Sequence, residues 1–256
     1  MSQIELGHVA TTLTGGVATI TFFHPAQNSL PSRLLTALTA AIDTAGRDPE
    51  VRVIVLASEG ERAFCAGASF DELAAIRDFE AGKRFFSGFA NVINAMRKCP
   101  KFIVGRVHGK AVGGGVGLAA STDYCMATIH ASVKLSELAV GIGPFVVGPT
   151  CERKLGLSGF SELAINATEW RTAVWAKEKG LFNELFDTTA YMDDYLARFT
   201  TILAASSPDA MSALKRVCWQ GTEHWDTLLT ERAAISGQLV LSDFTRDAIA
   251  SFKAKG

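Results

Sequence analysis

The feature that most constrains the fold of this chain is a glycine-rich segment near its middle, GKAVGGGVGLAAS at residues 109–121. The preceding residues 102–107 are apolar and rich in β-branched side chains, which predicts a buried strand. The residues after the glycines, 118–121, are small or favour a helix. The segment therefore predicts a strand, a tight glycine turn and a helix start.

The start of a helix is suited to binding negative charge. Its first N–H groups have no partner within the helix, and its dipole is positive at that end. Such a turn binds a phosphate, or an oxygen that gains negative charge during a reaction. The segment lacks the Gly-Lys-Ser/Thr ending of a phosphate-binding loop and the third glycine of the dinucleotide fingerprint. An oxyanion site is the better functional interpretation, and a turn packed for purely structural reasons is the alternative.

A second turn of the same kind is predicted about forty residues earlier, in ERAFCAGASFDE at residues 61–72. It follows an apolar strand predicted at 51–57, and its Gly67-Ala68 turn leads into a helix. Ser69 and Glu72 have the spacing of a capping box. Two such turns could direct one N–H each at a single carbonyl oxygen, although an ordinary strand-to-helix turn fits the same residues.

The other elements favour an α/β core followed by helices. Alternating strands at 9–14 and 17–23 flank Gly15-Gly16, which predicts a hairpin, and Ser32 is expected to cap a helix to about residue 45. An amphipathic helix is predicted at 79–98. We expect an α/β core over residues 1–157 and a mainly helical region over 158–256, with a short strand at 181–186 and helices at 159–167, 172–179, 191–205, 208–218, 222–239 and 243–254.

Glu137 is a lone acid at the entrance to an apolar, turn-rich segment, residues 138–149. A carboxyl group surrounded by valine, isoleucine and phenylalanine loses solvation, so its basicity rises. That property suits a group that moves protons in a reaction. A loop carboxylate or a charge at a helix terminus is the structural alternative.

Composition excludes several classes of function. The 256 residues carry a net charge of −1, so there is no electrostatic case for nucleic acid or an anionic membrane as partner. The five cysteines are scattered without Cys-x-x-Cys spacing, and the first residues do not form a signal peptide. No apolar run approaches membrane-spanning length, and no histidines have metal-site spacing. We expect a cytoplasmic protein with reduced thiols and no metal.

Five segments together resemble the enoyl-CoA hydratase/isomerase (crotonase) family: HPAQNSL (24–30), AFCAGASF (63–70), GKAVGGGVGLAASTDYCMAT (109–128), LSELAVGIGP (135–144) and FTRDAIASFKAK (244–255). The resemblance implies an α/β fold, a spiral of ββα repeats with a C-terminal helical region that builds trimers, often stacked into hexamers. It also implies an acyl-CoA thioester substrate and no separate cofactor, because coenzyme A is part of the substrate.

The resemblance assigns expected roles to individual residues. The backbone N–H groups of Ala68 and Gly114 would form the oxyanion hole for the thioester carbonyl. Backbone around Ala66 would meet the adenine end of coenzyme A, and Lys255 matches a lysine that approaches the nucleotide phosphates, in some members from a neighbouring subunit. Glu137 matches the glutamate that the family's hydratases and isomerases keep.

Three features depart from the family pattern. Gly117 stands where hydratases of the two-glutamate type carry their other catalytic acid, and Ser69 replaces the usual aspartate. Phe145-Val146-Val147 replaces a glycine-rich stretch, which predicts a shorter and drier acyl pocket. We expect Gly117 and Phe145 to contact the substrate, and we expect Glu137 to be the only catalytic carboxylate.

Three functions remain open on the sequence alone. The first is a hydratase or dehydratase for a short enoyl-CoA, branched or unbranched, and overall resemblance places it slightly ahead. The second is a Δ3,Δ2-enoyl-CoA isomerase, which the single carboxylate favours on mechanism. The third is an acyl-CoA-binding protein without turnover. For the assembly the resemblance implies a homotrimer or a dimer of trimers. The C-terminal region also carries large apolar residues for which a partner surface is expected: Trp170, Trp175, Trp219, Trp225 and Phe244.

Overall fold

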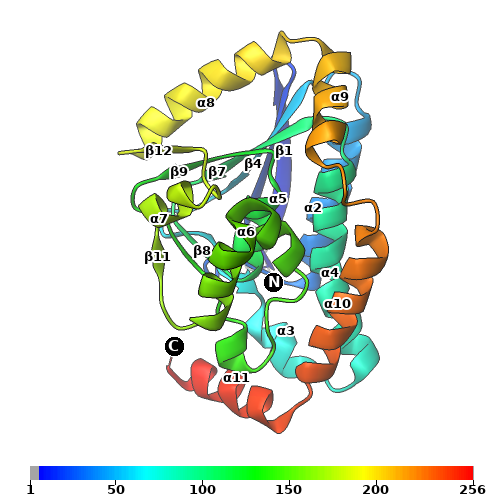
Figure 1. Ribbon diagram of the computed structural model, residues 1–256, viewed down its shortest axis with the longest axis vertical. Coiled ribbons are helices and arrows are strands. Elements are labelled where there is room, and N and C mark those ends of the chain that lie inside the picture. The colour runs from blue at the N-terminus through cyan, green and yellow to red at the C-terminus, as the bar shows by residue number, and fades with distance from the viewer. Residues whose placement is uncertain (1–5, 256) are drawn as a thin grey trace.

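The computed structural model describes residues 6–255 and the side chains of residues 6–251 (Figure 1). The largest sheet in this part of the chain has six strands in the order β1-β2-β4-β7-β9-β12. Apart from the β1–β2 pair, neighbouring strands of this sheet run parallel. The strands are β1 (His8–Thr14), β2 (Val17–Phe23), β4 (Val53–Ser58), β7 (Phe102–Val107), β9 (Tyr124–Thr128) and β12 (Glu184–Phe186).

The predicted hairpin and the predicted parallel strand are both confirmed. Strands β1 and β2 pair antiparallel, with Thr14 opposite Val17. Gly15 and Gly16 connect them with φ values of 57° and 80°, which a two-residue turn with the twist of a hairpin requires. All six residues of β4 are buried, as expected for a strand covered on both faces.

Two smaller sheets bring the two predicted turns together. One has the order β11-β10-β8-β5, and the other pairs β3 with β6. Strands β5 and β8 are parallel neighbours, so the turns that follow them lie at the same edge. The strands are β3 (Ser29–Leu30), β5 (Ala63–Cys65), β6 (Gly67–Ala68), β8 (Lys110–Val112), β10 (Ser132–Lys134) and β11 (Arg171–Thr172).

Three long helices pack side by side along one side of the molecule (Figure 1): α2 (Ser32–Arg47), α4 (Phe79–Lys98) and α10 (Trp225–Leu239). Helix α4 has the predicted bounds, between the N-cap Asp78 and the C-cap Cys99. Helices α4 and α10 approach closely because glycines face each other. A Cβ added to Gly82 would lie only 2.8 Å from the carbonyl oxygen of Gly237.

The predicted cap of α2 is wrong in its detail. The N-cap is Pro31, which makes no side-chain cap, and Ser32 is the first helical residue. The amide and the hydroxyl of Ser32 both donate to Oε2 of Glu72, at 2.9 and 2.7 Å. Glu72 belongs to α3 (Phe70–Ala75), whose N-cap Ser69 accepts a hydrogen bond from the Glu72 amide as predicted. The glutamate of the predicted capping box therefore binds a neighbouring helix.

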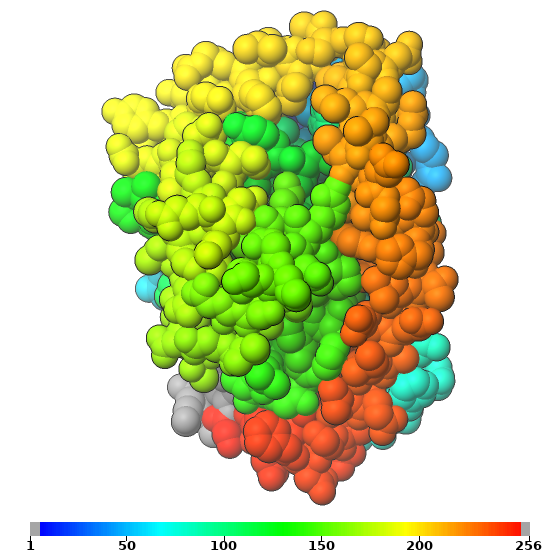
Figure 2. All heavy atoms as spheres, in the orientation of Figure 1, coloured from blue at the N-terminus to red at the C-terminus, as the bar shows by residue number. Residues whose placement is uncertain are grey.

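Most C-terminal helices lie within a few residues of their predicted bounds, but α6 (Gly148–Ile165) begins eleven residues before the helix predicted at 159–167. The region is also not separate from the core. Strand β12 pairs with β9 and strand β11 with β10. The division expected after residue 157 falls inside α6, one residue beyond its kink at Gly156. Elements from α6 onward cover the face shown in Figure 2. They are α6 (Gly148–Ile165), α7 (Ala173–Glu178), α8 (Thr189–Ala204), α9 (Pro208–Cys218), α10 and α11 (Asp243–Lys255).

No helix in the described part of the chain combines the length and apolar character needed to span a membrane.

Candidate active site

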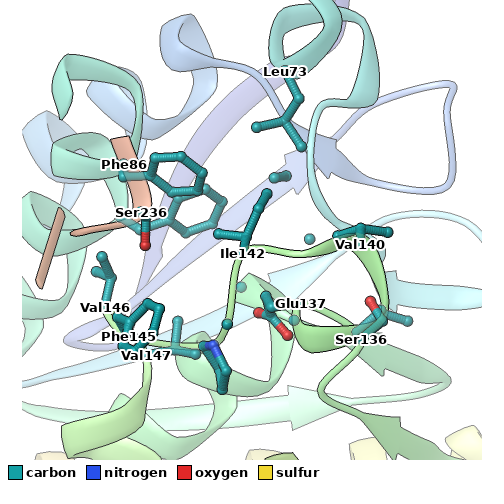
Figure 3. Close-up of a pocket in the computed structure, with 18 of the residues that line it drawn as sticks. Leu73, Phe86, Ser136, Glu137, Val140, Ile142, Phe145, Val146, Val147 and Ser236 are labelled. Atoms are coloured by element: carbon teal, nitrogen blue, oxygen red, sulfur yellow. The ribbon is translucent and has the colours of Figure 1, made fainter. Parts of the chain in front are cut away.

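A small cavity lies where the two glycine turns meet the loop that carries Glu137 (Figure 3). Its volume is about 60 Å³, enough for a few water-sized groups. Both turns, the loop 136–147 and helices α3, α4 and α10 contribute to its lining. Most lining side chains are apolar: Phe70, Leu73, Phe86, Phe89, Val140, Ile142, Phe145, Val146 and Val147.

The two glycine turns are in direct contact. Gly67 has φ +84°, and a Cβ there would lie 2.7 Å from the Val112 carbonyl oxygen and 3.3 Å from the Gly114 nitrogen. A Cβ on Gly115 would lie 2.5 Å from the Cys65 carbonyl oxygen. Any side chain at either position would separate the turns, so glycine is required at both. The predicted proximity of the two turns is confirmed.

The amide of Gly114 is the free group in the second turn. Gly114 opens helix α5 (Gly114–Ser121), after the N-cap Gly113. The Gly113 amide donates to the Lys134 carbonyl oxygen at 2.8 Å. No described residue accepts a hydrogen bond from the Gly114 amide. This N–H lines the cavity at the positive end of α5, so it is available to a negatively charged ligand oxygen.

The carboxyl group of Glu137 lies against the same turn. A Cβ added to Gly113 would be 2.8 Å from Oε1 of Glu137, so only a glycine leaves room for the carboxyl group. The residue is half-buried as a whole, but Oε2 is shielded from solvent and has no hydrogen-bond partner among the described residues.

Burial raises the pKa of Glu137 from the usual 4.5 to about 7, and a hydrogen bond from its own backbone opposes the shift only in part. The group therefore exchanges a proton readily near neutral pH, as a general acid or base must.

Gly117 is not among the residues that line the cavity, and its expected contact with the substrate stays a prediction. It lies in the middle of α5 and is fully enclosed. A Cβ added there would be 2.7 Å from the Cβ of Val147 and closer still to Val147 Cγ1. Val147 therefore occupies the space that a side chain at position 117 would need.

The other expected site residues fall into two groups. Ala66, Ala68, Gly114, Glu137 and Phe145 all border the cavity. The side chain of Lys255 lies outside the described side chains, so its expected role stays a prediction.

Sequence analysis missed several side chains of the site, among them Phe86 and Phe89 of α4 and Ser236 of α10. The amphipathic pattern predicted that α4 buries one face, but a pattern does not specify what that face contacts. A Cβ on Gly114 would lie 2.8 Å from Cζ of Phe89 and closer still to Cε1, so Phe89 packs directly on the second turn.

No three His, Cys, Asp or Glu residues in the described part of the chain are grouped so as to hold a metal ion.

Comparison with known proteins decides the family. The family described as enoyl-CoA hydratase/isomerase matches residues 12–252, nearly the whole chain. The chain belongs to this family. Its members share the crotonase fold, and the solved structures agree with that assignment. An enoyl-CoA hydratase from Bacillus halodurans superposes with a TM-score of 0.87 at 19% identity, covering 95% of this chain and 99% of that one.

The curated relatives include hydratases as well as an isomerase. The short-chain-enoyl-CoA hydratase of Clostridium acetobutylicum is 26% identical, over 98% of this chain and 97% of that protein. The peroxisomal Delta(3,5)-Delta(2,4)-dienoyl-CoA isomerase of Arabidopsis thaliana is 25% identical, over 88% of this chain and 84% of that protein. The enoyl-CoA hydratase/isomerase family thus includes relatives with different reactions at similar identity to this chain.

Proposed function

We propose that the cavity binds the acyl end of an enoyl-CoA thioester and that Glu137 moves the protons of the reaction. Family membership supports the substrate class. Glu137 supports the chemistry, because it is the one ionisable side chain among the described residues that line the cavity. A carboxyl group with a pKa of about 7 serves both as base and as acid at neutral pH.

The thioester oxygen would be held by the amides of Ala68 and Gly114. Both residues line the cavity, and the turns that carry them are in contact. Removing a proton next to a thioester carbonyl leaves negative charge on its oxygen. Two N–H groups directed at that oxygen stabilise the enolate, and the positive end of α5 adds to the effect.

Isomerisation of a 3-enoyl-CoA to the 2-enoyl-CoA is the reaction that the geometry supports best. Glu137 would take a proton from C2, the two amides would hold the dienolate, and Glu137 would return a proton to C4. The observation that carries this proposal is Val147 against Gly117: an apolar side chain fills the place where a second carboxylate would stand. One base suffices for this reaction, and no water is consumed.

Hydration of a 2-enoyl-CoA is the second candidate. It is favoured by the relatives that match over almost their whole length, such as the short-chain-enoyl-CoA hydratase described above and a probable enoyl-CoA hydratase of Bacillus subtilis, 27% identical over 93% of each chain. In this reaction Glu137 would both activate the water and supply the C2 proton.

Binding of acyl-CoA without turnover fits less well than either reaction. Burying a carboxyl oxygen without a partner is unfavourable, and a binding site has no use for it.

The reaction is tested by incubating the protein with crotonyl-CoA and with 3-hexenoyl-CoA and measuring product masses. An unchanged mass with a moved double bond indicates isomerisation, whereas a product heavier by one water indicates hydration. Glu137→Gln keeps the shape of the site and serves as the control. Failure of the wild type to convert either substrate would contradict the proposed enzyme.

A homotrimer or a dimer of trimers remains our proposal for the assembly. Trp219 and Trp225 are buried within the chain, and Trp175 is half-buried, so they do not require a partner. Trp170 and Phe244 are 38% and 66% exposed, and further apolar side chains are exposed on the C-terminal helices. Sedimentation as a monomer at micromolar concentration would contradict this proposal.

A further inference from the structure

The hydroxyl group of Ser236 is a polar group on the cavity wall that the proposed reaction does not use. Ser236 lies on α10, is 1% exposed and lines the cavity. Figure 3 shows its oxygen directed away from the helix, on a side of the pocket separate from Glu137.

No described residue shares a hydrogen bond with the Ser236 hydroxyl. Thr230, on the same helix, shows what a helical hydroxyl normally does, because it donates to the Asp226 carbonyl oxygen one turn back at 2.9 Å. Thr227, the third hydroxyl residue of α10, also has no described side-chain partner but is exposed to solvent. Ser236 is buried, so the cavity is the space from which a partner of its hydroxyl can come.

The position of Ser236 is fixed by the packing of its neighbour in the chain. A Cβ added to Gly237 would lie 2.6 Å from the Lys83 nitrogen, so α10 cannot shift toward α4. Phe86 of α4 lines the cavity with Ser236, as does Val146 from the loop that follows Glu137. The hydroxyl is therefore presented from a helix closely packed on α4, in an otherwise apolar wall. A buried hydroxyl without a partner is unfavourable, and a purely hydrocarbon chain would leave it so.

The charges around the cavity restrict what the partner can be. No lysine or arginine is among the described residues that line it, and its one ionisable group is the acidic Glu137. A ligand carboxylate placed here would be buried without a counter-charge, which is strongly unfavourable. A neutral oxygen has no such penalty.

We propose that Ser236 donates a hydrogen bond to a ketone or hydroxyl oxygen carried by the acyl chain of the substrate. The inference rests on the proposed function, because it assumes that an acyl-CoA occupies the cavity. Glu137 and Ser236 line the cavity from different elements, the 136–147 loop and α10, so we place this oxygen beyond the carbons between which the proton moves. The substrate class is a short oxo- or hydroxy-acyl-CoA, and a dicarboxylic acyl-CoA is disfavoured.

Binding of saturated acyl-CoAs, which have no double bond to convert, tests this inference separately from catalysis. The probes are hexanoyl-CoA, 5-oxohexanoyl-CoA and adipyl-CoA, with the dissociation constants measured by calorimetry. We expect the wild type to bind the 5-oxo compound several-fold more tightly than hexanoyl-CoA and adipyl-CoA least tightly. Ser236→Ala is expected to reduce the preference for the 5-oxo compound by about 3- to 10-fold, the usual effect of one neutral hydrogen bond.

Two further variants keep the test decisive. Ser236→Cys retains the approximate size with a much weaker donor, and we expect it to lose the preference as Ser236→Ala does. Ser87→Ala on α4 is the matched control, because the Ser87 hydroxyl already donates to the Lys83 carbonyl oxygen at 2.7 Å and does not line the cavity. This control should retain the full preference.

The outcomes separate the inference from the proposed function. Equal binding of hexanoyl-CoA and 5-oxohexanoyl-CoA, unchanged in Ser236→Ala, would overturn the role of Ser236 while enoyl-CoA turnover still supported the enzyme. Tightest binding of adipyl-CoA would overturn the preference for a neutral oxygen. No binding of any probe, together with no turnover, would overturn both proposals.

Discussion

The side chain of Val147 packs against the Cα of Gly117, so that a Cβ added to this glycine would lie 2.7 Å from the Cβ of Val147. Gly117 belongs to α5 and Val147 is the N-cap of α6. The contact holds the start of α6 against the helix that opens at the second glycine turn. It also means that a second acid cannot be introduced at position 117 without removing Val147.

The first prediction is a coupling of stability between these two residues. Gly117→Ala is expected to destabilise the protein by about 1–3 kcal/mol, because the added methyl overlaps Val147. In the Val147→Gly background the same substitution should lower the free energy of unfolding by much less. Urea unfolding of the two single variants and the double variant gives the coupling free energy, expected to exceed about 1 kcal/mol.

The matched control is the same double-mutant cycle with Val146→Gly in place of Val147→Gly. The change in unfolding free energy caused by Val146→Gly should add to that caused by Gly117→Ala. Equal coupling in both cycles would show that the overlap with Val147 is not the cause.

The second prediction concerns the pH dependence of Glu137. Because burial raises its pKa to about 7, kcat/KM for proton abstraction should rise with pH and level off above about pH 7. Glu137→Gln should lower kcat by roughly two orders of magnitude or more and leave thioester binding largely intact. Undiminished turnover in this variant would show that another group moves the proton.

The same raised pKa makes a third prediction, on stability. The folded protein binds the Glu137 proton more tightly than the unfolded chain. The resulting contribution to the free energy of unfolding is fully present below about pH 4.5 and is lost as the pH rises through about 7. Relative to Glu137→Gln, the wild type should lose on the order of 3 kcal/mol over this interval. Chemical unfolding at several pH values measures the difference, and a constant difference would contradict the prediction. Glu231→Gln, on the exposed face of α10, controls for the loss of one negative charge.

The fourth prediction tests the amide of Gly114. Any side chain there would overlap the ring of Phe89, so the test starts from Phe89→Ala, which makes room. In that background Gly114→Ala keeps the N–H and Gly114→Pro removes it, while proline is tolerated at the first position of a helix. The proline variant should have a kcat about 10²- to 10³-fold below that of the alanine variant. Equal rates in two folded variants would exclude this N–H as an oxyanion donor.

The fifth prediction concerns the attachment of α9 to the core. The Lys215 ammonium lies 2.8 Å from Oδ2 of Asp123, with side chains only 3% and 8% exposed. Asp123 also accepts a hydrogen bond from Nε1 of Trp219 at 2.7 Å. Lys215→Met should destabilise the protein by about 3–5 kcal/mol, because it leaves the Asp123 charge buried without its partner.

Lys98→Met is the control for this change. Lys98 lies 2.7 Å from Oδ2 of Asp226, but both side chains are more than half exposed. Its loss should cost no more than about 1 kcal/mol. Equal losses in the two variants, measured by urea unfolding, would show that burial does not determine the value of these ion pairs.

Features encoded over short stretches of sequence were predictable. The bounds of α4 follow from a sustained helical period between Asp78 and Pro100, and the hairpin follows from two alternating strands around Gly15-Gly16. The two glycine turns were also predictable, since each depends on a few neighbouring residues. Their proximity was expected because each turn was thought to direct one N–H at the same carbonyl oxygen.

Features decided by distant packing were not predictable from local pattern. Glu72 fits a capping box in sequence, yet its carboxylate binds Ser32, forty positions away. Gly117 was expected to contact the substrate because of its place in the family motif, and the motif did not show that Val147, the N-cap of α6, fills the space beside it. Ser236 lies in a helix whose sequence contains no sign of a site, and only its position beside α4 brings it to the cavity.

The lining of the cavity has two parts that differ in their tolerance to substitution, because the glycine turns are packed backbone to backbone. At Gly67, which lines the cavity, and at Gly115, next to the lining residue Gly114, the opposing backbone leaves no room for a side chain, so this wall of the cavity tolerates almost no substitution. Across from it, Leu73, Phe86 and Val146 contribute side chains whose size can change without altering the backbone of either turn. Changes of acyl preference should therefore accumulate on helices α3, α4 and α10 and on residues 138–147 of the loop, while the turns and Glu137 stay constant. A directed-evolution library for new substrates is best confined to that variable wall.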